Sequence, residues 1–198
     1  MSTDTVDKGK RRFLVASTSV VGAVGAGFVA VPFLSSWMPS ERAKNAGAPI
    51  EADISRLEEG RMLTVEWQSK PVWVVRRSEK TLADLETNNA SLKDPASDNI
   101  DQQPEYAKSQ QRSRKPEILV LVGICTHLGC SPTFRPDIAP ADLGEDWLGG
   151  FFCPCHSSKF DMAGRVFQGV PAPTNLVVPP HYYVTDNTIL IGEDGEAA

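Results

Sequence analysis

CTHLGC at residues 125–130 and CPCHSS at residues 153–158 are the two stretches that decide how this sequence folds. Each combines cysteine and histidine at short spacing, and together they hold all 4 cysteines of the chain. Clustered cysteines with nearby histidines indicate a metal site, whereas scattered ones are typical of core packing. Both stretches follow apolar runs, so we expect them to project as loops from a rigid sheet.

Three interpretations of these motifs differ in how they use the cysteines and histidines. A zinc site could take two of each, but zinc fingers space their ligand pairs differently and two cysteines would stay unused. Two disulfides would use every cysteine in an oxidising compartment and leave the matched histidines unexplained. An iron–sulfur cluster with two cysteines on one iron and two histidines on the other accounts for every residue. It uses Cys125, Cys153, His127 and His156, and leaves Cys130 and Cys155 for a disulfide.

In combination, the two motifs resemble those of the Rieske subunits of ubiquinol–cytochrome c reductase, the respiratory cytochrome bc complex. The resemblance covers nearly the whole chain, and GVPAP at residues 169–173 is similar to the family's proline-rich loop beside the cluster. It implies a mainly β fold, an antiparallel β-sandwich with a cluster-binding subdomain at about residues 123–173. It also implies one Rieske-type [2Fe–2S] cluster with Cys125 and Cys153 on the inner iron, His127 and His156 on the outer iron, and a Cys130–Cys155 disulfide.

This ligand set suits a centre that oxidises quinol. Two ferric ions, two sulfides and two thiolates sum to zero charge, so adding an electron is easier than with four thiolates. Each histidine ring also keeps a nitrogen that is not on iron and can titrate. Because the family residue that matches His156 hydrogen-bonds the quinol, we predict that His156 is the catalytic proton acceptor. The electron then passes to a c-type cytochrome.

Three residues near the motifs are expected to affect either the reduction potential of the cluster or its contact with another subunit. Ser158 matches a family serine that hydrogen-bonds a bridging sulfide. Phe160 stands where many mitochondrial relatives have tyrosine, so we expect a lower reduction potential here. Leu128 matches a position that contacts the quinol pocket, and an apolar loop tip suits docking on another subunit. Local packing under the disulfide is the alternative explanation for Leu128.

The resemblance also implies partners: a cytochrome b subunit, a c-type cytochrome subunit, ubiquinol and the lipid bilayer, in a dimeric complex. The chain lacks a C-x-x-C-H haem-attachment motif, so it is not a complete enzyme by itself. Its net charge of −5 makes nucleic acid an unexpected partner. Two alternatives remain open, a Rieske protein that supplies an oxygenase or arsenite oxidase, and an exported zinc-stabilised interaction domain.

An N-terminal anchor is predicted because residues 13–40 carry no charge. A bilayer core needs roughly 20 apolar residues, so we expect an uncleaved transmembrane helix at 13–38. A cleaved signal peptide, the alternative, has a shorter apolar core. Basic residues predominate in the tail at 1–12, which places it in the cytoplasm and the cluster domain in the periplasm of the bacterial inner membrane. Lys10, Arg11 and Arg12 also resemble a twin-arginine export signal, although topology-setting charge explains them equally.

Residues 39–49 are small and polar and are predicted to form a flexible tether. Residues 50–198 are expected to form the periplasmic domain. Its short apolar runs, separated by turn residues, predict an antiparallel all-β structure. These runs are Met62–Trp67, Val72–Val75, Ile118–Val122, Phe151–Phe152, Val166–Phe167, Leu176–Val178, Tyr182–Val184 and Ile189–Ile191.

Four further expectations concern the rest of this domain. Asp186-Asn187 predicts a tight hairpin turn. Thr81 is predicted to cap a short helix that follows it. Residues 88–117 are mostly polar and are interpreted as a long surface loop. His181 is interpreted as an ordinary surface or edge residue.

Overall fold

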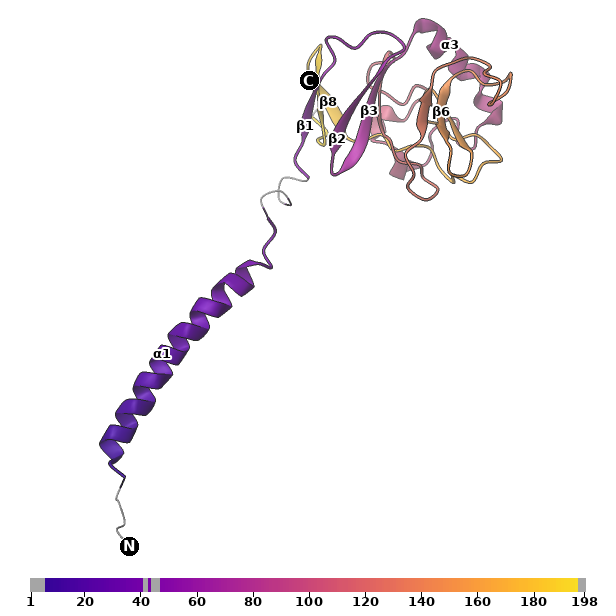
Figure 1. Cartoon of the computed structure of the whole chain (residues 1–198). Helices are drawn as coiled ribbons and strands as arrows, with labels where there is room; N and C mark the ends of the chain where they lie inside the picture. The colour runs from indigo at the N-terminus through magenta and orange to yellow at the C-terminus, as the bar shows by residue number, and fades with distance from the viewer. Residues whose placement is uncertain (1–5, 41–42, 44–46, 196–198) are drawn as a thin grey trace. The chain divides into compact units, whose positions relative to one another are not determined.

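The computed structural model describes residues 6–40, 43 and 47–195. The chain divides into two units, Met1–Asn45 and Ala46–Ala198. Figure 1 shows one long helix in the first unit and the strands in the second. Parts of the predicted N-terminal tail and of the tether at 39–49 lie outside the described residues.

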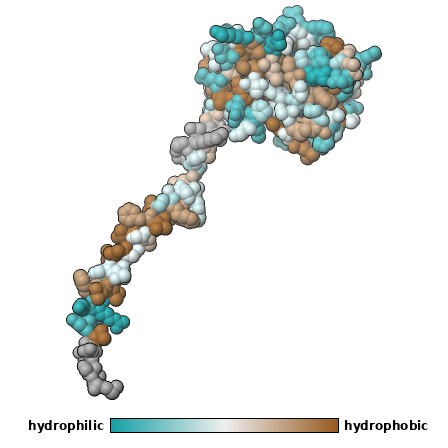
Figure 2. Space-filling view, in the orientation of Figure 1, coloured by the Kyte–Doolittle hydropathy of each residue, from teal (hydrophilic) through white to brown (hydrophobic). Residues whose placement is uncertain are grey.

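The first unit contains helix α1 (Lys8–Ser35), which is long and apolar enough to cross a membrane. It begins earlier than the predicted anchor, because Asp7 caps it by accepting hydrogen bonds from the backbone N–H groups of Gly9 and Lys10. At about 1.5 Å per residue, the helix is roughly 42 Å long. Figure 2 shows hydrophobic side chains along most of it and hydrophilic ones near its N-terminal end.

The second unit contains three antiparallel sheets of three strands each, which confirms the mainly β prediction. The first sheet has the order β1-β9-β8, with β1 (Ile50–Asp53), β8 (His181–Thr185) and β9 (Thr188–Ile191). The second has the order β2-β3-β4, with β2 (Met62–Trp67), β3 (Lys70–Arg76) and β4 (Ile118–Val122). The third has the order β5-β6-β7, with β5 (Thr133–Arg135), β6 (Gly150–Cys153) and β7 (Ser158–Asp161).

The second sheet separates two hydrophobic clusters, because successive side chains of a strand point to opposite faces. Leu119 and Leu121 of β4 belong to the cluster that contains Cys125, Cys153 and the third sheet's aromatic residues. The alternate β4 residues Ile118, Val120 and Val122 belong to the cluster that holds β1 and β9. Every residue of β4 is buried, as its unbroken apolar run predicts. The site-bearing sheet is therefore packed against a rigid inner layer.

Helix α3 (Glu79–Thr87) forms where a helix was expected, but the predicted cap is wrong. Ser78 is the N-cap, and its hydroxyl accepts a hydrogen bond from the backbone N–H of Thr81 at 3.0 Å. Thr81 thus lies within the first turn. The hairpin turn at Asp186-Asn187 is confirmed between β8 and β9.

The segment at 88–117 is a long loop, as predicted, but its placement at the surface is wrong for several residues. This segment forms the short turns η1 (Asn89–Ser91), η2 (Ile100–Gln102) and η3 (Glu105–Ala107). Several of its side chains, including Arg112, are fully buried. Its polar composition misled the prediction, because charged side chains are rarely buried.

Two apolar runs expected as strands are not strands in this fold. Val166 and Phe167 form only isolated bridges, to Phe160 and Leu92 respectively. Leu176–Val178 belongs to no strand, although Val122 donates its backbone N–H to the Val177 carbonyl oxygen at 2.8 Å. Both runs are nonetheless apolar because they line the core.

His181 begins the edge strand β8, as the edge interpretation expects, but it does not lie at the surface. The side chain is fully buried, with Nδ1 at 2.9 Å from the Pro179 carbonyl oxygen and 3.1 Å from the Tyr106 hydroxyl. Burial lowers the pKa of His181 to about 4. The side chain is therefore a neutral hydrogen-bonding core residue at physiological pH.

Candidate metal centre

The first cysteine–histidine motif forms a closed loop directly after β4. Cys125 donates its backbone N–H to the Cys130 carbonyl oxygen at 2.7 Å, and Gly129 donates to the Cys125 carbonyl oxygen at 3.0 Å. Gly129 has a φ of 84°, which glycine adopts without strain. These bonds fold the six residues back on themselves, so the side chains between the two cysteines project outward.

The second motif is the tip of a hairpin between β6 and β7. Cys153 and Ser158 are paired across the two strands, and the residues between them make the turn. Gly150 opens β6 where any Cβ would overlap the carbonyl oxygen of Phe160, so only glycine allows the strands to approach this closely. The hairpin therefore holds the second motif on the third sheet.

The fold brings all four predicted cluster ligands to one place. The Cys125 and Cys153 side chains are each 2% exposed and lie beside one another. The rings of His127 and His156 lie with centroids 4.7 Å apart and nearly perpendicular, at 87°. His127 is half-buried, whereas His156 is exposed. The arrangement has an inner pair of sulfur donors and an outer pair of nitrogen donors.

Cys130 and Cys155 form a disulfide that joins the two loops, as predicted. The sulfur atoms of Cys130, Cys153 and Cys155 all lie within 4.8 Å of one another. A disulfide sulfur is not a thiolate, so only Cys153 of these three can ligate a metal. Cys125 and Cys153 are the free cysteines.

The donor set fits a [2Fe–2S] cluster with mixed ligands. Burial raises the pKa of the Cys125 thiol, and the neighbouring Cys153 raises it further. Such a thiol stays protonated at neutral pH unless a bound metal ion displaces the proton. The two buried thiols and the two accessible imidazoles match the donors that Rieske centres use.

The three neighbouring residues predicted from the sequence lie close to this centre or at its rim. Ser158 is fully buried, and its hydroxyl lies near the Cys125 thiol, whose pKa it lowers. Phe160 is fully buried opposite Phe151 and offers no hydroxyl group. Leu128 is 71% exposed, unlike the packed leucines of the core. Local packing under the disulfide does not account for this exposure.

Two further residues, which were not predicted, hydrogen-bond to the proline-rich loop or to the residue directly after it. Lys93 donates from Nζ to the carbonyl oxygens of Val170 and Ala172, at 2.8 and 2.6 Å. Thr126 donates from Oγ1 to the Thr174 carbonyl oxygen at 2.7 Å. Thr126 could have been suspected, because it lies between two predicted ligands. Nothing in the sequence around Lys93 indicates its contact with the proline-rich loop.

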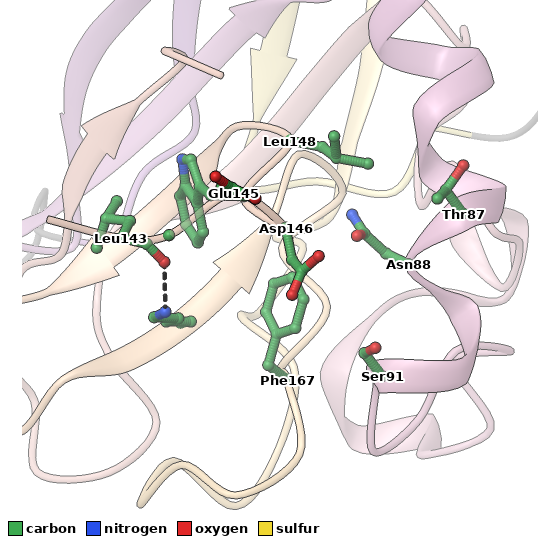
Figure 3. A pocket seen from close by; sticks show the side chains of 11 residues that line it. Thr87, Asn88, Ser91, Leu143, Glu145, Asp146, Leu148 and Phe167 are labelled. Carbon is green, nitrogen blue, oxygen red and sulfur yellow. Dashed lines mark hydrogen bonds between the residues drawn. The ribbon is translucent and has the colours of Figure 1, made fainter. Parts of the chain in front are cut away.

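A groove of about 540 Å³ lies elsewhere, between the end of α3 and the loop at 143–148 (Figure 3). Its lining among the described residues includes none of the predicted cluster residues. Lys159 also lines it and donates from Nζ to the Leu143 carbonyl oxygen at 3.0 Å. This groove is therefore separate from the metal centre.

The three sheets, the disulfide-linked loops and the paired cysteines and histidines define a Rieske-type [2Fe–2S] protein. The family described as "Rieske [2Fe-2S] domain" matches residues 49–180. The family described as "Ubiquitinol-cytochrome C reductase Fe-S subunit TAT signal" matches residues 1–40.

Relatives with similar sequences match nearly the whole chain. The ubiquinol–cytochrome c reductase iron–sulfur subunit of Allochromatium vinosum is 62% identical, covering 100% of this chain and 95% of its own. The subunit of the same name from Bradyrhizobium diazoefficiens is 40% identical, covering 92% and 94%. The mitochondrial "Cytochrome b-c1 complex subunit Rieske" of Candida albicans is 35% identical, covering 91% and 75%. The chain belongs to the family of ubiquinol–cytochrome c reductase iron–sulfur subunits.

Proposed function

We propose that this chain takes an electron and a proton from ubiquinol and passes the electron to a c-type cytochrome, as one subunit of a quinol–cytochrome c oxidoreductase. The observation that carries the proposal is the pairing of the His127 and His156 rings above two buried cysteines. Membership of the iron–sulfur subunit family supports the same activity.

Four residues would hold the cluster, in two roles. Cys125 and Cys153 would hold one iron as thiolates, and His127 and His156 would hold the other as neutral imidazoles. A [2Fe–2S] cluster supplies one-electron transfer when it is bound. The Cys130–Cys155 disulfide fixes the two loops relative to each other, which keeps both ligand pairs in register.

His156 is proposed to receive the quinol proton. It is exposed, so a substrate hydroxyl can reach its ring. One ring nitrogen of His156 would hold the metal, and the other would accept the hydrogen bond and then the proton. Leu128, exposed on the neighbouring loop, provides an apolar contact for the quinol-binding subunit.

The proposed placement of the chain relative to the membrane depends on helix α1. We place it across the bacterial inner membrane as a single anchor, at about residues 13–38, with the basic N-terminal tail in the cytoplasm. The cluster domain, residues 50–198, then lies in the periplasm and is joined to the anchor by a tether at 39–49. Its partners are the cytochrome b and c-type cytochrome subunits of a dimeric complex, together with the lipid bilayer.

Low-temperature EPR of the purified protein after ascorbate reduction tests the ligation, and a redox titration follows it. We expect a rhombic spectrum with an average g value below that of all-cysteine clusters, and complete reduction by ascorbate. A signal that needs dithionite would contradict the quinol-oxidising function. Zinc in place of iron would contradict the cluster itself.

A further inference from the structure

The proline-rich loop has few hydrogen-bond donors of its own. Pro171 and Pro173 have no backbone N–H group, so the loop cannot form a regular ladder with a neighbouring strand. The Ala172 N–H between them donates to the Ser158 hydroxyl at 3.1 Å. The carbonyl oxygens of the loop must therefore find their donors in other segments of the chain.

Lys93 supplies such donors from a single side chain. Its Nζ donates to the carbonyl oxygens of Val170 and Ala172, at 2.8 and 2.6 Å. Each of these carbonyls belongs to a peptide bond that precedes a proline, so one ammonium group holds two successive X-Pro units. Hydrogen bonds from an ionised donor are stronger than those between neutral groups. The ammonium group therefore fixes the middle of the loop.

The main chain around Lys93 is held by separate hydrogen bonds. The Lys93 N–H donates to the Val166 carbonyl oxygen at 3.0 Å, and the Gln168 N–H donates to the Ser91 carbonyl oxygen at 2.8 Å. These bonds involve no atom of the Lys93 side chain. A substitution at this position can therefore remove the ammonium group and leave the pairing of the two segments in place.

The loop that Lys93 holds is in contact with the metal centre. Ala172 is fully buried and belongs to the same hydrophobic cluster as Cys125 and Cys153. Ser158, which accepts the Ala172 N–H, has its hydroxyl near the Cys125 sulfur. Ala172 thus connects two groups: its carbonyl accepts from the Lys93 ammonium, and its N–H donates to the Ser158 hydroxyl.

We propose that Lys93 is a positioning residue of the metal centre, which holds Ala172 so that the Ser158 hydroxyl stays directed at Cys125. A hydroxyl oxygen that accepts one hydrogen bond turns its own hydrogen toward a different partner, so a fixed Ala172 N–H restricts the rotation of the Ser158 hydroxyl. A donor at a ligand sulfur stabilises the reduced form of a bound cluster more than the oxidised form. Lys93 acts through Ala172 and Ser158 and not by contact with the reacting atoms.

Hydrogen–deuterium exchange of the full-length protein tests the first step, on the peptide that covers residues 168–175. Lys93→Met keeps the apolar stem and removes the ammonium group, so the Ala172 N–H should exchange about fivefold faster. Lys93→Arg keeps an ionised donor and should restore slow exchange. The matched control is Lys80→Met, because Lys80 pairs with Asp84 on α3 at 2.6 Å and should leave this peptide unchanged.

An EPR-monitored redox titration in native membranes tests the second step. At a fixed ambient potential, Lys93→Met should lower the ratio of reduced to oxidised cluster about threefold, and by no more than Ser158→Ala lowers it. When Ser158→Ala is already present, adding Lys93→Met should cause no further change, because the hydroxyl that Lys93 positions is absent. An equal shift in both backgrounds would overturn the proposal, since the lysine charge would then act directly.

Two other results would overturn the role of Lys93. Wild-type exchange of the Ala172 N–H in Lys93→Met would show that the ammonium group does not hold the loop, whether or not a cluster is bound. Faster exchange with an unchanged ratio would show that the loop position does not affect the centre. The second step rests on the proposed ligation, so a wild-type protein without a Rieske signal would overturn the ligation and this step together, while the exchange result would still decide the first step.

Discussion

Replacing Ser158 by alanine removes the one hydroxyl that the structure places near the Cys125 sulfur. Ser158 is fully buried and also accepts a hydrogen bond from the backbone N–H of Ala172 at 3.1 Å. The side chain therefore connects a predicted ligand to the proline-rich loop. Its loss should change two independent properties, the midpoint potential and the folding stability.

The two magnitudes follow from the two contacts. Reduction increases the negative charge on the sulfur atoms, so a donor near Cys125 stabilises the reduced form more. If the difference is about 1 kcal/mol, the midpoint of this one-electron couple falls by about 40 mV. The Ala172 N–H loses its partner in a buried position, which costs about 1–3 kcal/mol of unfolding free energy.

An EPR-monitored titration measures the midpoint, and thermal unfolding of the loaded protein measures stability. Ser131→Ala is the control, because Ser131 is exposed directly after Cys130 and should change neither quantity. A Ser158→Ala protein with an intact signal and an unchanged midpoint would refute the donor role, even if it unfolded earlier. Lowered stability alone would leave Ser158 with a structural role only.

Further outcomes are expected at other positions. Phe160→Tyr should raise the midpoint by supplying a donor, and an unchanged titration would contradict this. Replacing Cys130 and Cys155 by serine opens a loop with a sequence separation of 25 and should cost about 3 kcal/mol, visible as a lower Tm. His156→Ala should abolish quinol oxidation together with the mixed-ligand EPR spectrum, and normal turnover would exclude the proposed role. Burial lowers the pKa of His181 from 6.5 to about 4, so the unfolded chain binds more protons in this range. Stability should then fall as the pH drops from about 6.5 to about 4, and urea titrations of His181→Gln should show a weaker dependence.

The cluster motifs and most strands could be predicted because their signals are local. The five residues of β4 are apolar throughout, and the fold buries all of them between two layers. Each ligand pair lies within one loop, at the end of a strand or between two paired strands. The short spacing of the two ligands within each motif therefore limits their relative positions without any tertiary contact.

The burial of residues in the segment at 88–117 could not be predicted, because the contacts that bury them come from residues far away in the sequence. Its buried arginine, Arg112, bonds to carbonyl oxygens far along the chain, such as that of Leu176, 64 residues later. Backbone carbonyls carry no signature of side-chain type, so the sequence cannot reveal which of them will satisfy a guanidinium. His181 was misplaced similarly, because its partner Tyr106 lies 75 residues away.

The difference between local and distant contacts also applies to the metal centre. The proposed ligands come from two short motifs, whereas the groups that surround them come from segments far away in the sequence. Lys93 reaches the proline-rich loop across 77 and 79 residues, and Arg112 reaches Ala163 across 51. Substitutions in the segment at 88–117, such as one at Lys93, can therefore change the position of the proline-rich loop while both motifs stay intact.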